Sequence, residues 1–142
     1  FLSIALALSG CGTRAVKPPR GVQPIEKTME ATGYCKCGKC CNWRRSWLGL
    51  GPPVVASGPN KGARKKVGVT ASGSKAHMGT IAADTKKYPF GTVMYIPGYG
   101  YGRVEDRGSA IQGEHIDLYF KSHKDALHWG RQHVRVRIYL PR

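Results

Sequence analysis

Residues 79–120 read GTIAADTKKYPFGTVMYIPGYGYGRVEDRGSAIQGEHIDLYF. Three short apolar stretches in this segment each contain one aspartate: Asp84, Asp106 and Asp117. Acidic side chains are scarce, because the chain has eight Asp and Glu residues against 23 Lys and Arg. An ionised carboxylate is costly to remove from water, so one that lies among apolar residues usually has a partner or a function. We therefore take the three aspartates as candidate site residues, with the binding of loop amides as the structural alternative.

The composition indicates a single, mainly β domain. The chain has 142 residues, of which 41% are hydrophobic, and this length suits one domain with a modest core. Its 19 Gly and 9 Pro favour short strands and tight turns over a helix bundle. We expect strands at residues 28–34, 67–71, 79–83, 92–96, 103–105, 116–120 and 134–140.

One short helix is expected near the C-terminus. Ser122 is a suitable N-cap, and Asp125 follows three residues later, as in a capping box. Gly130 is a suitable end for this helix. The capping role explains Asp125, so we leave this aspartate out of the candidate site.

The net charge of +15 and the sequence pI near 10.0 indicate an anionic partner. A positive field of this strength favours nucleic acid, anionic lipid or an anionic polymer of the cell wall. The basic, Gly- and Pro-rich residues 49–66 are expected to form an exposed connection between strands.

The first residues help to choose between these partners. Residues 1–8 read FLSIALAL, an apolar run that is too short to span a bilayer but fits a secretory signal. The tetrad LSGC, which ends at Cys11, resembles the lipobox of bacterial lipoproteins. We expect residues 1–11 to be a truncated lipoprotein signal peptide with Cys11 as the lipidation site. A plain signal peptide or a buried strand is the alternative.

Residues 12–27 are expected to form a flexible linker, because they are rich in proline and basic residues. Residues 28–142 are then the folded domain. An exported lipoprotein rarely meets nucleic acid, so the expected partners are the membrane, through the lipid anchor, and the cell wall. We expect a monomer in the bacterial cell envelope, on a periplasm-facing membrane leaflet.

Four cysteines form a cluster within residues 35–41: Cys35, Cys37, Cys40 and Cys41. Two local disulfides would suit an oxidising, exported compartment, and we favour this interpretation. A closed structural zinc site is the alternative, because Cys37 and Cys40 have the two-residue spacing of zinc ligands. The sequence offers no second, distant cysteine pair for such a site. No other cofactor is expected.

The sequence resembles the 3D domain, a family named for three aspartates. The resemblance rests on the order and spacing of GTIAAD, PFGTVMYIPGYG, VEDRGSAIQGEHIDLYF and SHKDALHWGR. It covers about residues 28–140 and is strongest over residues 79–131. The related MltA-type lytic transglycosylases share this domain. The resemblance implies a six-stranded double-psi β-barrel.

The resemblance also implies an activity. Such enzymes cleave peptidoglycan glycan strands between N-acetylmuramic acid and N-acetylglucosamine and leave a 1,6-anhydro sugar. Asp117 matches the catalytic acid of the family, Asp106 the aspartate that supports it, and Asp84 the third aspartate. Serine replaces the second glycine of the common E-D-x-G-G at Ser109.

Other residues are candidates for substrate binding. The segment VTASG matches a family segment beside the site and contributes Thr70, Ser72 and Gly73. Gly108, His115 and Tyr99 complete the candidate set. Two other functions remain open: a barrel that binds glycan without cutting it, and a polysaccharide hydrolase that uses Asp117 and Asp106 as a pair.

Overall fold

The computed structural model describes residues 15–142, so the predicted signal peptide and Cys11 lie outside the described residues. The elements in chain order are β1 (Ile25–Tyr34), α1 (Gly38–Cys41), β2 (Trp43–Arg45), β3 (Pro53–Val55), β4 (Thr80–Ala83), β5 (Val93–Ile96), β6 (Gly100–Asp106), β7 (His115–Tyr119), α2 (His123–Trp129) and β8 (Gln132–Tyr139). Within these residues, no helix is both long and apolar enough to cross a membrane.

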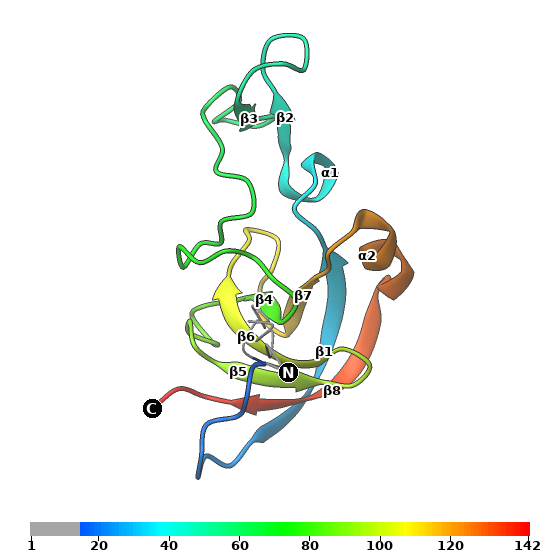
Figure 1. Cartoon of the computed structure of the whole chain (residues 1–142). Coiled ribbons are helices and arrows are strands. Elements are labelled where there is room, and N and C mark those ends of the chain that lie inside the picture. The colour runs from blue at the N-terminus through cyan, green and yellow to red at the C-terminus, as the bar shows by residue number, and fades with distance from the viewer. Residues whose placement is uncertain (1–14) are drawn as a thin grey trace, which may run out of the picture.

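Six of the strands close into a barrel in the order β1-β7-β4-β6-β5-β8 (Figure 1). Two neighbouring pairs, β1 with β7 and β4 with β6, run parallel. The other four pairs are antiparallel. The prediction of a mainly β fold with a closed six-stranded barrel is confirmed.

Alternation along the strands fills the barrel and leaves polar side chains on its outside. On β7, Ile116 and Leu118 are fully buried, whereas Asp117 between them is only partly buried. Successive side chains of a strand point to opposite faces, so β7 turns Asp117 away from the core. The interior is filled mainly by Met29, Ile81, Met94, Ile96, Val104, Ile116, Leu118, Val136 and Ile138.

An excursion from the barrel separates β1 from β4. It contains α1 and a small hairpin of β2 and β3, which projects beyond one end of the barrel (Figure 1). Sequence analysis missed α1 because four residues carry no helical period. The hairpin lies partly inside residues 49–66, which we expected to be only a connection.

The expected strand at residues 67–71 is wrong. Gly68 adopts a positive φ of 74°, and Val69 forms only an isolated bridge to Lys75. Val69 is 44% exposed, so no apolar face anchors this segment to a sheet. It passes instead along the outside of the barrel as a loop.

Two predicted boundaries can be compared with the structure. Strand β1 begins at Ile25 because Ile25–Ala31 pair with β8, so the last three residues of the expected linker belong to the barrel. Helix α2 follows the expected N-cap, since the Ser122 side chain accepts a hydrogen bond from the Asp125 N–H, and Gly130 ends it with a φ of 67°. The helix itself is confirmed.

Candidate active site

The strand register brings the candidate carboxylates together. Thr32 on β1 is paired with Asp117 on β7, and Asp117 is paired in turn with Ala82 on β4. A register shift between β4 and β6 then pairs Ala82 with Asp106. Four neighbouring strands therefore present Thr32, Asp117, Ala82 and Asp106 in one row across the barrel surface.

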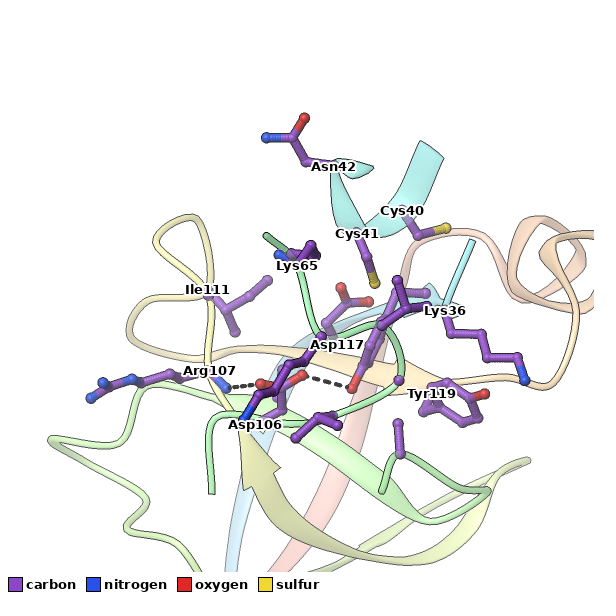
Figure 2. Close-up of a pocket in the computed structure, with 18 of the residues that line it drawn as sticks. Lys36, Cys40, Cys41, Asn42, Lys65, Asp106, Arg107, Ile111, Asp117 and Tyr119 are labelled. Atoms are coloured by element: carbon purple, nitrogen blue, oxygen red, sulfur yellow. Dashed lines mark hydrogen bonds between the residues drawn. The ribbon is translucent and has the colours of Figure 1, made fainter. Parts of the chain in front are cut away.

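A cavity of about 370 Å³ lies over this row. Its barrel side contains Asp106 and Asp117, and Cys41 and Asn42 of the excursion lie opposite them (Figure 2). Basic side chains also line it, from Lys36, Lys65, Lys66 and Arg107. The cavity is thus a cleft between the barrel and the excursion, with two carboxylates against a basic rim.

The environment of the cleft raises the pKa of the Asp117 carboxyl group. Burial raises its pKa above the ordinary value, and the negative charge of Asp106 adds to the rise. A hydrogen bond from Thr32 and the charge of His115 act in the opposite direction without cancelling it. A carboxylic acid with a raised pKa can hold a proton for transfer.

Thr32 links Asp117 to His115. The Thr32 hydroxyl donates to Asp117 Oδ1 at 2.9 Å and lies 2.9 Å from His115 Nε2. A hydroxyl has one hydrogen, so a Thr32 that donates to Asp117 accepts from the Nε2–H of His115. These two hydrogen bonds hold one oxygen of Asp117 and leave its side chain directed into the cleft.

Asp106 is held by three hydrogen bonds. Its Oδ1 accepts from the backbone N–H groups of Ala71 and Arg107 at 3.0 and 2.9 Å. Its Oδ2 accepts from the Tyr34 hydroxyl at 3.1 Å. Asp106 is therefore fixed at the cleft as a carboxylate acceptor near Asp117.

The third aspartate lies elsewhere. Asp84 lies outside this cleft and accepts hydrogen bonds from the backbone N–H groups of Gly113 and Lys86. The bond from Gly113 is the main cause that lowers the pKa of Asp84. Asp84 thus ties the end of β4 to the loop before β7, in the structural role that we weighed as the alternative.

Residues 79–140, which carry all three aspartates, match the model of the 3D domain. These residues are a 3D domain. The match contains the strands β4 to β8 and the helix α2.

Two relatives come from Bacillus subtilis (strain 168). YabE, whose name refers to cell wall shaping, is 40% identical over 58 residues, which are 41% of this chain and 14% of YabE. The cell wall-binding protein YocH is 37% identical over 75 residues, which are 50% of this chain and 26% of YocH. The chain therefore spans about a quarter or less of the length of these relatives.

Solved structures of MltA from E. coli are also similar. A crystal structure of MltA is 23% identical, with a TM-score of 0.42, over 53% of this chain and 28% of MltA. MltA with bound chitohexaose is 22% identical, with a TM-score of 0.43, over 51% of this chain and 28% of MltA.

The VTASG segment of this chain lies beside Asp106. Thr70 is buried and bonds through its hydroxyl to Ser72 and Ser74, and Gly73 has a φ of 89°. These residues shape a turn whose Ala71 N–H reaches Asp106. Thr70, Ser72 and Gly73 are not among the residues that line the cleft, whereas Gly108 is.

Tyr99 and His115 also stand outside the cleft lining. The Tyr99 hydroxyl accepts from the Gly79 N–H and donates to the Tyr119 carbonyl. Its ring packs against Phe120 and Trp129. A substrate-binding role for Tyr99 stays a prediction, whereas His115 reaches the site through Thr32.

Sequence analysis missed Thr32, Tyr34 and the basic rim. Thr32 and Tyr34 precede the cysteine cluster as T-G-Y, two residues apart and hence on one face of a strand. Their spacing was visible, but their partners are 85 and 72 residues away. Beside the cleft, Cys35, Cys37, Cys40 and His123 could hold a metal ion.

Proposed function

We propose that this protein is a peptidoglycan lytic transglycosylase, with its barrel of the double-psi type. The observation that supports this most strongly is the environment of Asp117. Its carboxyl group lines an open cleft and has a raised pKa. Among residues 15–142, Asp117 makes no ion pair with lysine or arginine. It can therefore begin the reaction as a protonated acid.

The proposed reaction needs one acid. Asp117 donates its proton to the glycosidic oxygen, and the bond between that oxygen and C1 of the muramic sugar breaks. The C6 hydroxyl oxygen of the same sugar bonds to C1, and the Asp117 carboxylate accepts the C6 hydroxyl proton. The products are a 1,6-anhydro end and a free 4-hydroxyl, and the acid is regenerated.

The attacking hydroxyl makes a second catalytic carboxylate unnecessary. An intramolecular nucleophile can reach an effective molarity of about 10⁵ M or more. A hydrolase would instead need a base or nucleophile opposite the acid. Asp106 already accepts three hydrogen bonds, which suits a role in raising the pKa of Asp117. We propose a holding role, not a chemical one, for Asp84.

The relatives and the charge of the site support the proposed substrate. The printed names of YabE and YocH refer to the cell wall. The basic rim of the cleft suits an anionic polymer of the cell wall. We propose further that the protein is a monomer, anchored by lipid at Cys11 to a periplasm-facing leaflet of the bacterial cell envelope.

Binding without cleavage is the second candidate. The relative named a cell wall-binding protein favours it. In that case the cleft would hold glycan, and Asp117 would act only as a polar contact. Release of soluble fragments separates this candidate from the first.

The test is digestion of purified peptidoglycan sacculi, with product masses read by mass spectrometry. We expect anhydro-ended fragments from the wild type and a loss of about 100-fold or more in Asp117→Asn, as for removal of a general acid. The variant should stay folded, because the amide has nearly the size of the carboxyl group and keeps an oxygen that can accept the hydrogen bond from Thr32. The exposed Glu26→Gln on β1 is the control and should retain activity. Wild-type activity in Asp117→Asn, or reducing ends among the products, would contradict the proposal.

A further inference from the structure

Three of the four clustered cysteines converge on a histidine that is distant in sequence. Cys35 follows β1, Cys37 precedes α1, Cys40 lies within α1, and His123 is the first residue of α2. The sulfur atoms and one ring nitrogen of these four residues all lie within 4.8 Å of one another. Cys37 and Cys40 are 86 and 83 residues from His123 along the chain. The histidine supplies the distant ligand that the cysteine spacing alone does not offer.

The distances fit the edges of a metal tetrahedron. The sulfur atoms of Cys35 and Cys40 are 3.7 Å apart, and His123 Nδ1 lies 3.5 Å from Cys37 Sγ and 3.3 Å from Cys40 Sγ. Around a tetrahedral zinc ion, bonds of about 2.3 Å to sulfur and 2.0–2.1 Å to nitrogen give edges of about 3.8 Å between sulfurs and about 3.6 Å between sulfur and nitrogen. These three distances therefore match a tetrahedral zinc site, and the other three distances among the four atoms are no longer than 4.8 Å.

We propose that Cys35, Cys37, Cys40 and His123 form a structural zinc site. Three thiolates and one imidazole complete a tetrahedral shell with no open position, which is the pattern of structural and not catalytic zinc. The backbone N–H of Cys37 donates a hydrogen bond to the Cys35 sulfur, with 3.4 Å between nitrogen and sulfur. Hydrogen bonds of this kind orient the side chains that bind a metal.

Cys41 is separate from this set. Its thiol donates to the Cys35 carbonyl oxygen at 3.1 Å and lines the cleft. In the structure all four cysteines are free thiols. Two disulfides would consume Cys41 and leave His123 without a role, whereas the zinc site uses His123 and leaves Cys41 free.

The site would fasten the excursion to the barrel. Helix α1 has four residues, and none of them is buried, so burial of α1 contributes little to its position. Zinc would join it to α2, which packs on β1. Because Cys40, Cys41 and Asn42 line the cleft (Figure 2), zinc would also fix the wall opposite Asp117. This inference concerns a structural metal and holds whether or not the cleft cuts glycan.

The first experiment measures the zinc content of the purified full chain by elemental mass spectrometry. A second measurement follows the zinc that is released when a mercurial reagent blocks the thiols. We expect one zinc per chain in the wild type. Cys37→Ser and His123→Ala should lose it. Two matched controls should keep it: Cys41→Ser, in the same cluster, and His128→Ala, on the same helix.

Substitution of zinc by cobalt separates the loss of a metal ligand from the misfolding of a variant. The wild type should give the intense visible bands of tetrahedral cobalt with sulfur ligands. His123→Cys should restore binding with a shifted spectrum, because four thiolates also bind zinc tetrahedrally. Thiols are then counted in denatured, chelator-treated protein. Two results would overturn the proposal. One is wild-type protein that contains no zinc and has fewer than four free thiols among residues 35–41. The other is zinc retention in both Cys37→Ser and His123→Ala.

Discussion

Thr32 acts on the proton of Asp117 from a neighbouring strand. Its hydroxyl donates to Asp117 Oδ1 and so stabilises the charged form, which lowers the pKa that burial raises. A proton donor works best when its pKa lies near the working pH. Thr32 therefore limits the rise in the pKa of Asp117, and in the proposed reaction it acts through Asp117 and not on the sugar.

Thr32→Val tests this role. The change keeps the shape of the side chain and removes the hydroxyl, so the pKa of Asp117 should rise further. The acid must be protonated to act, and the decline of kcat/KM with increasing pH should therefore move to higher pH. The measurement is the pH profile of sacculus digestion. Thr28→Val, an exposed change on the same strand, should leave the profile in place, and an unmoved profile in Thr32→Val would contradict the role.

At the residue scale, the sequence could identify Asp117 and Asp106 but not what surrounds them. Both aspartates lie within a recognisable motif. Thr32 and Tyr34 lie on β1 and reach them only because β1 runs parallel to β7. Parallel pairing between distant strands leaves no local pattern, so these partners could not be predicted.

At the scale of elements, the irregularity between β4 and β6 sets the position of Asp106. Ile81 pairs with Val104, and the next residue, Ala82, pairs with Asp106 instead of Glu105. Bulges of this kind are frequent beside active sites, where they redirect a side chain. A regular ladder would have placed Glu105 in the row with Asp117. The composition of a strand does not reveal such a shift. The strand expected at residues 103–105 was also too short, since β6 runs over Gly100–Asp106.

Helix α2 depends on its N-cap, which sequence analysis did identify. The Ser122 Oγ accepts from the Asp125 N–H at 3.1 Å and donates to Asp125 Oδ2 at 2.6 Å. Ser122→Ala should lower the free energy of unfolding by about 1 kcal/mol, or the Tm by about 4 °C. Thermal unfolding followed by circular dichroism measures this. Lys124→Ala, exposed in the same turn, should change little, and an equal loss in both variants would show that the cap is not the cause.

At the scale of the whole molecule, the charge of +15 acts together with the shape of the cleft. Lys36, Lys65, Lys66 and Arg107 concentrate part of this charge around two carboxylates. Salt weakens such a field, since the screening length falls from about 10 Å at 0.1 M to about 3 Å at 1 M. Attraction of an anionic polymer to this rim should therefore depend on ionic strength.

Cosedimentation with sacculi at low and high salt tests the basic rim. We expect wild-type binding to weaken as salt rises. Lys65→Gln with Lys66→Gln should bind more weakly at low salt and respond less to added salt. Lys121→Gln with Lys124→Gln removes the same charge away from the cleft and should resemble the wild type. Equal losses in the two double variants would assign the attraction to total charge and not to the rim.

Residues 35–78 are the part of the molecule whose path could not be predicted from the sequence. The closed barrel followed from short strands and a family motif, and the structure bears it out. The path of the excursion did not, because it brings a cysteine cluster close to a histidine on α2. Such a meeting is a property of the closed barrel, not of either segment.

The position of β1 limits how this protein can be shortened. Strand β1 closes the ring by pairing with β7 on one side and β8 on the other, yet it precedes the matched residues 79–140. A polypeptide that began at residue 79 would expose the backbone edges of both neighbours. Unpaired edges recruit strands from other molecules, so such a fragment would aggregate unless residues 25–34 were supplied as a separate peptide.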